Sequence, residues 1–162
     1  MKTIILAGGY GTRITEYTKK IPKPMIKIRG LPLLTHIMRI FTSQGYNEFI
    51  IAAGYKKKII QNYYSRSKEF PNLKVIDTGK ETMTGGRILK LKSYFNDKEN
   101  FFFTYGDGLS SINLKKLKKF HLKNKKIATV TAVRPPVRFG ELLIKKNRVL
   151  KFKEKPEIKS SW

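Results

Sequence analysis

The chain has 162 residues and a formal net charge of +24 at pH 7, from 35 Lys and Arg against 11 Asp and Glu. It holds no Cys and only two His, which excludes disulfides, thiolate metal sites, Cys nucleophiles and multi-His metal centres. With 40% hydrophobic residues, a chain of this length predicts one folded domain over residues 1–162.

The large positive charge attracts polyanions, so nucleic acid, anionic lipid and phosphorylated small molecules are the partners to weigh. No apolar run approaches the ~18 residues of a membrane helix. A strand-like segment follows Met1 directly, without the pattern of a signal peptide. We therefore expect a cytoplasmic protein that makes no membrane contact.

In chain order, apolar segments bounded by glycine, proline and polar residues alternate between strand and helix patterns. Strands are predicted at 2–7, 47–53, 73–77, 100–105 and 127–133, with a short extended piece at 25–28 and an antiparallel pair at 141–144 and 149–153. Helices are predicted at 32–44, 56–65, 85–95 and 114–124, the third capped by Thr84. This alternation predicts an α/β fold with a mostly parallel central sheet flanked by helices, whose ligands bind at the carboxyl ends of the strands.

A glycine-rich loop follows the first predicted strand, with the sequence LAGGYGTR at residues 6–13. Glycines at this place let backbone N–H groups approach a phosphate or a base closely. Arg13 adds a planar fork of donors that suits phosphate oxygens. The loop is neither a Walker A motif nor a complete dinucleotide fingerprint, because Ile14 stands where a third glycine would be. An ordinary glycine-rich turn remains the alternative.

Four further segments carry candidate chemistry. Pro22 and Pro24 fix the backbone around Lys23, and a pre-positioned ammonium suits phosphate charge that develops during transfer. Residues 82–87 (TMTGGR) open a predicted helix, where free N–H groups favour an anion or a base edge. Asp107 stands between two glycines at a strand end, where its carboxylate can ligate Mg²⁺. The fourth segment is the EKP tripeptide at 154–156, and each of the four taken alone is also consistent with a rigid loop, a helix cap or a turn.

Together and in this order, the five segments resemble the sugar-1-phosphate nucleotidylyltransferase family. Within that family the chain is most similar to the glucose-1-phosphate cytidylyltransferases, through residues 77–79 (DTG), 83–87 (MTGGR), 103–108 (FTYGDG) and 135–140 (PPVRFG). The resemblance implies a Rossmann-like nucleotide-diphospho-sugar transferase fold. It also implies an enzyme that converts CTP and α-D-glucose 1-phosphate into CDP-glucose and pyrophosphate, by Mg²⁺-dependent in-line attack on the α-phosphorus. Such a product serves CDP-sugar and O-antigen biosynthesis.

The resemblance also implies a role for individual residues. Those expected to hold the nucleotide are Leu6, Ala7, Gly8, Gly9, Gly11, Thr12, Thr82, Arg87 and Gly106, with Thr82 and Arg87 on the base side. Those expected to act in catalysis are Arg13 on the departing pyrophosphate, Lys23 near the reacting phosphorus, and Asp107 as a ligand of Mg²⁺. Glu154 is expected to meet the sugar and Lys155 its phosphate.

Three departures from the family pattern modify this interpretation. The chain is expected to be truncated at its C-terminus, so that the sugar-binding remainder, with a second metal-binding aspartate, is missing. The region 63–74 is shorter than its counterpart, and Ile21 stands where the family has the first lysine of its Lys-Pro-Lys-Pro motif. The absent strands would leave a sheet edge for a second copy of the chain or for the missing C-terminal half to cover.

Two other functions stay open. The charge fits a nucleic-acid-binding protein whose aromatic residues at 63–64 and 101–103 stack on bases, although these residues also alternate as core residues do. The expected truncation fits a non-catalytic nucleotide-binding fragment or subunit.

Overall fold

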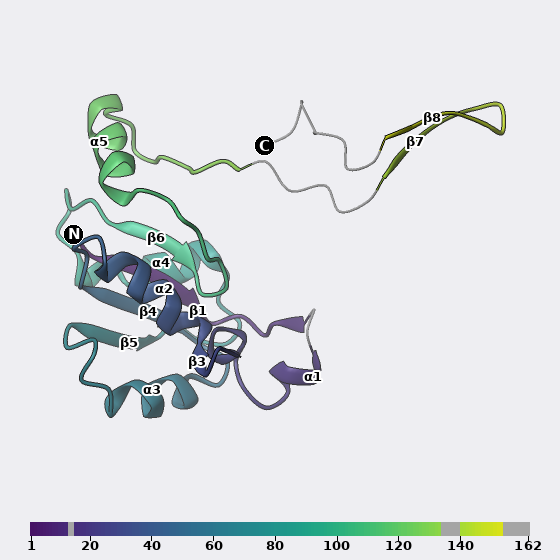
Figure 1. Cartoon of the computed structure of the whole chain (residues 1–162). Helices are drawn as coiled ribbons and strands as arrows, with labels where there is room; N and C mark the ends of the chain where they lie inside the picture. The colour runs from purple at the N-terminus through teal and green to yellow at the C-terminus, as the bar shows by residue number, and fades with distance from the viewer. Residues whose placement is uncertain (13–14, 134–139, 154–162) are drawn as a thin grey trace. The chain divides into compact units, whose positions relative to one another are not determined.

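The computed structural model describes residues 1–12, 15–133 and 140–153, and the chain divides into one unit at Met1–Lys118 and another at Lys119–Trp162. The first unit contains a four-stranded sheet whose strands run parallel in the order β5-β4-β1-β6 (Figure 1). Its strands are β1 (Thr3–Ala7), β4 (Phe49–Ala53), β5 (Leu73–Asp77) and β6 (Phe102–Tyr105). The predicted α/β fold with a mostly parallel sheet is therefore confirmed.

Helices and two small hairpins complete the described elements. The helices are α1 (Thr15–Thr18), η2 (Lys23–Met25), α2 (Leu33–Thr42), α3 (Lys57–Ser65), α4 (Thr84–Lys90), η3 (Lys92–Tyr94) and α5 (Leu114–Asn124). One hairpin is formed by β2 (Lys27–Ile28) and β3 (Leu31–Pro32), the other by β7 (Glu141–Lys145) and β8 (Arg148–Lys153). No helix in the described part of the chain is both long enough and apolar enough to cross a membrane.

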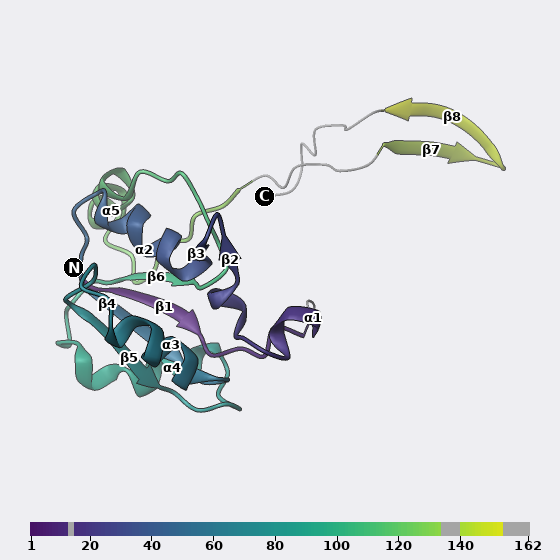
Figure 2. The ribbon, with the colours of Figure 1, turned by 60° about the horizontal axis from the view of Figure 1, so that its bottom comes forward.

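The two central strands, β1 and β4, are buried along their whole length because helices cover both faces of the sheet (Figure 2). Alternate residues of the strands face opposite sides of the sheet. Ile5 and Ile51 pack against α2 and α3 on one face. On the other face, Ile4 and Ile50 pack with Leu91, the residue that follows α4. Two of the aromatic residues weighed above as stacking platforms for bases, Tyr64 and Phe102, are buried in the first of these cores.

The order of the strands places a pocket at one end of the sheet. From β1 the chain moves outward to β4 and then to β5, and it returns to the other side of β1 to form β6. A crevice at such a reversal is the usual ligand site of open α/β sheets.

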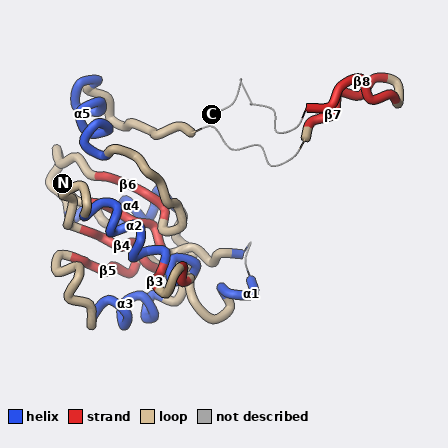
Figure 3. Tube along the Cα trace, viewed as in Figure 1, coloured by secondary structure: helices blue, strands red, loops and turns tan. Residues whose placement is uncertain are grey.

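The strand predicted at 127–133 is wrong: this segment belongs to no strand, and Figure 3 draws it as loop. Its β-branched residues favour extended backbone, but a strand also needs a neighbour that accepts its hydrogen bonds. In the described part of the chain no strand pairs with it, and Ile127 and Val130 are exposed. The helix predicted at 85–95 is also shorter than expected, since α4 ends at Lys90 and η3 follows.

The cap predicted for that helix is wrong as well. Met83 is the N-cap residue, without a side-chain hydrogen bond, and Thr84 is the first helical residue.

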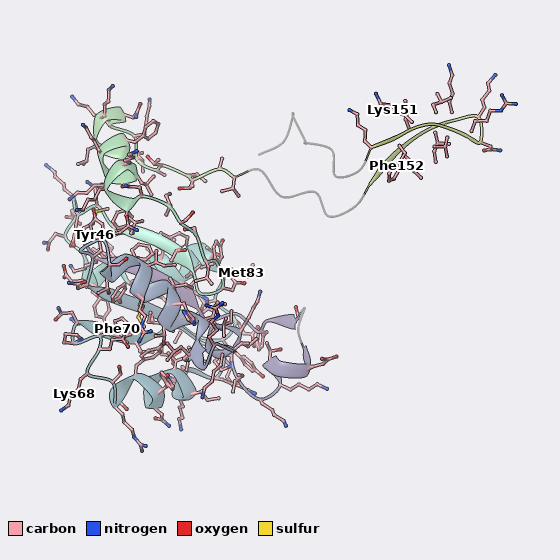
Figure 4. The ribbon with its side chains drawn as sticks, in the orientation of Figure 1. Tyr46, Lys68, Phe70, Met83, Lys151 and Phe152 are labelled. Atoms are coloured by element: carbon pink, nitrogen blue, oxygen red, sulfur yellow. The ribbon has the colours of Figure 1, made fainter. Side chains whose placement is uncertain are left out.

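The second unit contains the antiparallel pair that the sequence predicts. Lys146 and Asn147 adopt positive φ angles of 47° and 61° at the turn between β7 and β8, as a tight hairpin turn requires. Lys151 and Phe152 project to opposite sides of β8 (Figure 4), which is the two-residue period of a strand.

We expect α2 to contribute to stability mainly through its buried face. Ile37 is 1% exposed in the core, whereas Ile40, on the same helix, is only partly buried. Ile37→Ala should lower the free energy of unfolding by about 2–5 kcal/mol, because it removes buried methyl groups and leaves a cavity. Ile40→Ala is the matched control and should cost clearly less. Urea denaturation measures both, and equal losses would contradict this view of the core.

Candidate functional site

A pocket of about 340 Å³ opens at the carboxyl ends of β1 and β6, within the first unit. Four segments far apart in the sequence line it: the glycine loop after β1, the turn at η2, the segment that leads into α4, and the loop after β6. The lining residues are Leu6, Ala7, Gly8, Gly9, Gly11, Thr12, Lys23, Pro24, Thr82, Met83, Thr84, Arg87, Tyr105, Gly106 and Asp107. Met83 is strongly exposed and is labelled in Figure 4.

This lining includes each predicted nucleotide-binding residue, and both Lys23 and Asp107. Three other predicted site residues, Arg13, Glu154 and Lys155, lie outside the described residues. Tyr105, which belongs to the FTYGDG segment but is given no role of its own by the sequence, also lines the pocket.

Two glycines of the pocket are required by close packing. A Cβ on Gly106 would lie 2.7 Å from the carbonyl oxygen of Leu6 and 2.8 Å from Cγ of Pro24. A Cβ on Gly8 would lie 2.1 Å from Nη1 of Arg87. Real side chains cannot approach other atoms so closely, so a larger residue in place of Gly106 would have to displace backbone, and one in place of Gly8 would have to displace the guanidinium of Arg87.

Arg87 lies at the base of the glycine loop and is 5% exposed. Its Nη2 donates to the carbonyl oxygens of Gly8 and Lys80, at 3.0 and 3.1 Å. Its Nη1 donates to Oγ1 of Thr78 at 2.6 Å and to the carbonyl oxygen of Gly79 at 2.7 Å. Burial lowers the pKa of Arg87, and the charge of Asp77 opposes this effect. An arginine nevertheless stays cationic at neutral pH.

Lys23 and Asp107 form an ion pair in the pocket although they are 84 residues apart. Nζ of Lys23 donates to Oδ2 of Asp107 at 2.5 Å, and both side chains are partly exposed. Lys23 begins η2 and is flanked by Pro22 and Pro24, as expected for a lysine held by rigid backbone. A cation and a carboxylate thus face the same space.

The segment before α4 is held from two sides. Nζ of Lys90 donates to Oγ1 of Thr82 at 3.0 Å and to the carbonyl oxygen of Thr78 at 3.1 Å. The hydroxyl of Tyr10, in the glycine loop, donates to Oε1 of Glu81, and this hydrogen bond raises the pKa of Tyr10. Sequence reasoning missed these three supporting side chains, because their partners are loop atoms that no local pattern identifies.

The described residues contain no group of three or more His, Asp and Glu side chains that would enclose a metal ion. Among the described residues that line the pocket, Asp107 is the one that carries a carboxylate. Mg²⁺ is often bound by one or two carboxylates together with phosphate oxygens of a substrate, and the pocket fits that mode of binding.

Known proteins are similar in sequence to almost the whole chain. Residues 2–161 match the model of the nucleotidyl transferase family. The glucose-1-phosphate cytidylyltransferase of Salmonella typhimurium strain LT2 is 40% identical over 179 residues, which cover 97% of this chain and 70% of that protein. The probable glucose-1-phosphate cytidylyltransferase of Bacillus subtilis strain 168 is also 40% identical, over 96% of this chain and 69% of its own length.

Two solved structures share the fold. HddC from Yersinia pseudotuberculosis complexed with GMP-PN has a TM-score of 0.69 at 25% identity, over 96% of this chain and 70% of that one. UDP-glucose pyrophosphorylase complexed with UDP-glucose has a TM-score of 0.65 at 22% identity, over 99% of this chain and 70% of that one. The match over residues 2–161 and the 40% identity to two cytidylyltransferases show that the chain belongs to the nucleotidyl transferase family.

Proposed function

We propose that this chain transfers the cytidylyl group of CTP to α-D-glucose 1-phosphate and releases pyrophosphate. The choice of CTP and glucose 1-phosphate rests on one observation, the 40% identity to two proteins with that name over nearly the whole chain. The pocket supports the nucleotide part, since a glycine loop, a lysine and a carboxylate meet at the reversal of strand order. The product would enter CDP-sugar and O-antigen biosynthesis.

In the proposed reaction, a phosphate oxygen of the sugar phosphate attacks the α-phosphorus of CTP. A new P–O bond forms while the bond between the α-phosphorus and the bridging oxygen breaks, and pyrophosphate leaves with that oxygen. The attacking oxygen is already anionic, so the reaction needs no strong general base. Positioning and neutralisation of charge therefore carry most of the catalysis, which suits a chain with two His and no Cys.

Different residues of this chain would bind the phosphates, admit the ribose and neutralise charge. Backbone groups of the glycine loop would hold the phosphates, and Gly106, which lacks a side chain, would let the ribose approach the end of β6. Lys23 would neutralise charge near the reacting phosphorus. We assign Arg13 to the pyrophosphate and Glu154 and Lys155 to the sugar phosphate by family resemblance.

Asp107 would hold Mg²⁺ together with phosphate oxygens of the nucleotide. When bound there, Mg²⁺ neutralises phosphate charge and orients the attacking and leaving groups. Lys23 pairs with Asp107 in the free chain, so its ammonium would turn to the phosphates when the nucleotide enters.

The first test is thermal unfolding of the chain with Mg²⁺ and CTP, UTP, dTTP or GTP. A ligand at one hundred times its dissociation constant stabilises the folded state by about 2.7 kcal/mol. We expect CTP to raise the melting temperature selectively. A cooperative transition that no nucleotide shifts, or that all shift equally, would contradict the proposed base site.

The second test is Asp107→Asn, which removes a negative charge from the pocket with little change in shape. We expect pyrophosphate release to fall at least about 100-fold, the size seen when one electrostatic group is lost from a transition state. Asp97→Asn is the matched control, because Asp97 is exposed and is not part of the pocket lining. Equal rates for Asp107→Asn and the unchanged chain would refute the assignment of Asp107.

A further inference from the structure

We propose that Arg87 is a positioning residue, which clamps the glycine loop to the loop at 78–80 and so sets the shape of the pocket. It would act on the nucleotide through the position of the two loops that it joins. This inference rests on the proposed function only where it concerns CTP. The clamp itself is a property of the chain without a ligand.

The hydrogen bonds of Arg87 account for its terminal donors. The two terminal nitrogens carry four hydrogens, and five acceptors lie within 3.4 Å of them. Three of these acceptors lie at 78–80, and the other two are the carbonyl oxygens of Gly8, at 3.0 Å, and of Ala53 at the end of β4, at 3.4 Å. A base that approached these nitrogens would have to replace a bond that joins the two loops.

The backbone around Arg87 is shaped to receive the guanidinium. A Cβ on Gly8 would lie 2.1 Å from Nη1 and 2.3 Å from Cζ of Arg87, and a Cβ on Gly54 would lie 2.5 Å from the carbonyl oxygen of Gly79 and 2.7 Å from Nη1 of Arg87. Two glycines on neighbouring strand ends therefore leave room for one side chain. Such a space is expected where one side chain supports the backbone of two loops.

The charge of Arg87 has no carboxylate partner at ion-pair distance in the described part of the chain. Carbonyl oxygens and a hydroxyl surround it instead. Its charge and its planar fork can therefore be tested separately. Arg87→Lys keeps the charge and loses the fork, whereas Arg87→Ala loses both.

Amide hydrogen exchange in the free chain tests the clamp without a nucleotide. The amide of Tyr55 donates to the carbonyl oxygen of Gly8 at 3.2 Å, so its exchange reports on the position of the glycine loop. We expect Arg87→Lys to speed exchange at Tyr55 at least about tenfold, with Ile51 in β4 unchanged. Lys92→Met, which removes an exposed charge nearby, is the control and should leave Tyr55 unchanged. Unchanged exchange at Tyr55 in Arg87→Lys would overturn the clamp.

A double-mutant cycle on CTP binding tests whether the clamp acts on the nucleotide. Gly8→Ala alone should weaken CTP at least about tenfold, because its methyl group meets the guanidinium. In the Arg87→Ala background that space is free, so the same change should cost less than about threefold. Additive losses, or a Lys variant that binds CTP as tightly as the unchanged chain, would overturn the proposal. If the unchanged chain binds no CTP, the proposed function fails, while the exchange measurement still decides on the clamp.

Discussion

The pocket depends on a reversal of strand order beside β1. Because β4 and β6 flank β1 and run parallel to it, the glycine loop leaves the sheet between the loops that follow these two strands. Buried backbone carbonyls beyond the ends of the strands need hydrogen-bond donors from outside the sheet. The guanidinium of Arg87 satisfies several of them together, which is a task that no single neutral side chain performs.

The ion pair between Lys23 and Asp107 solves a second problem, that of charge in the free chain. A net charge of +24 disfavours a further cation, and the carboxylate of Asp107 is the counter-ion of Lys23. Phosphates that enter the pocket compete with Asp107 for Lys23, and the freed carboxylate then favours a cation. Under the proposed function, binding of the nucleotide and of a divalent cation would therefore assist each other.

The sequence predicts this fold well where structure depends on local pattern. The alternation of apolar segments locates β1, β4, β5 and α5 within about two residues, and the motifs locate the described lining of the pocket. The segment at 127–133 shows the limit, since its β-branched residues encode a preference for extended backbone but not a partner. Arg87 shows a second limit of sequence-based prediction. The TMTGGR motif predicts that Arg87 lies at the pocket, but not its hydrogen bonds, because the acceptors come from loops far apart in the chain.

The motif at the start of α4 can be understood from this clamp. A helix of seven residues with Gly85 and Gly86 in its first turn has poor intrinsic stability, at about 1 kcal/mol per glycine. A Cβ on Gly86 would lie 2.9 Å from Cγ2 of Thr82, so a side chain there would displace Thr82, which lines the pocket. Arg87 and Leu91, four residues apart, are both buried on one side of this segment. Arg87 attaches the helix to the loops of the pocket, and Leu91 attaches it to the apolar core. These two buried contacts compensate for the low helix propensity of the two glycines.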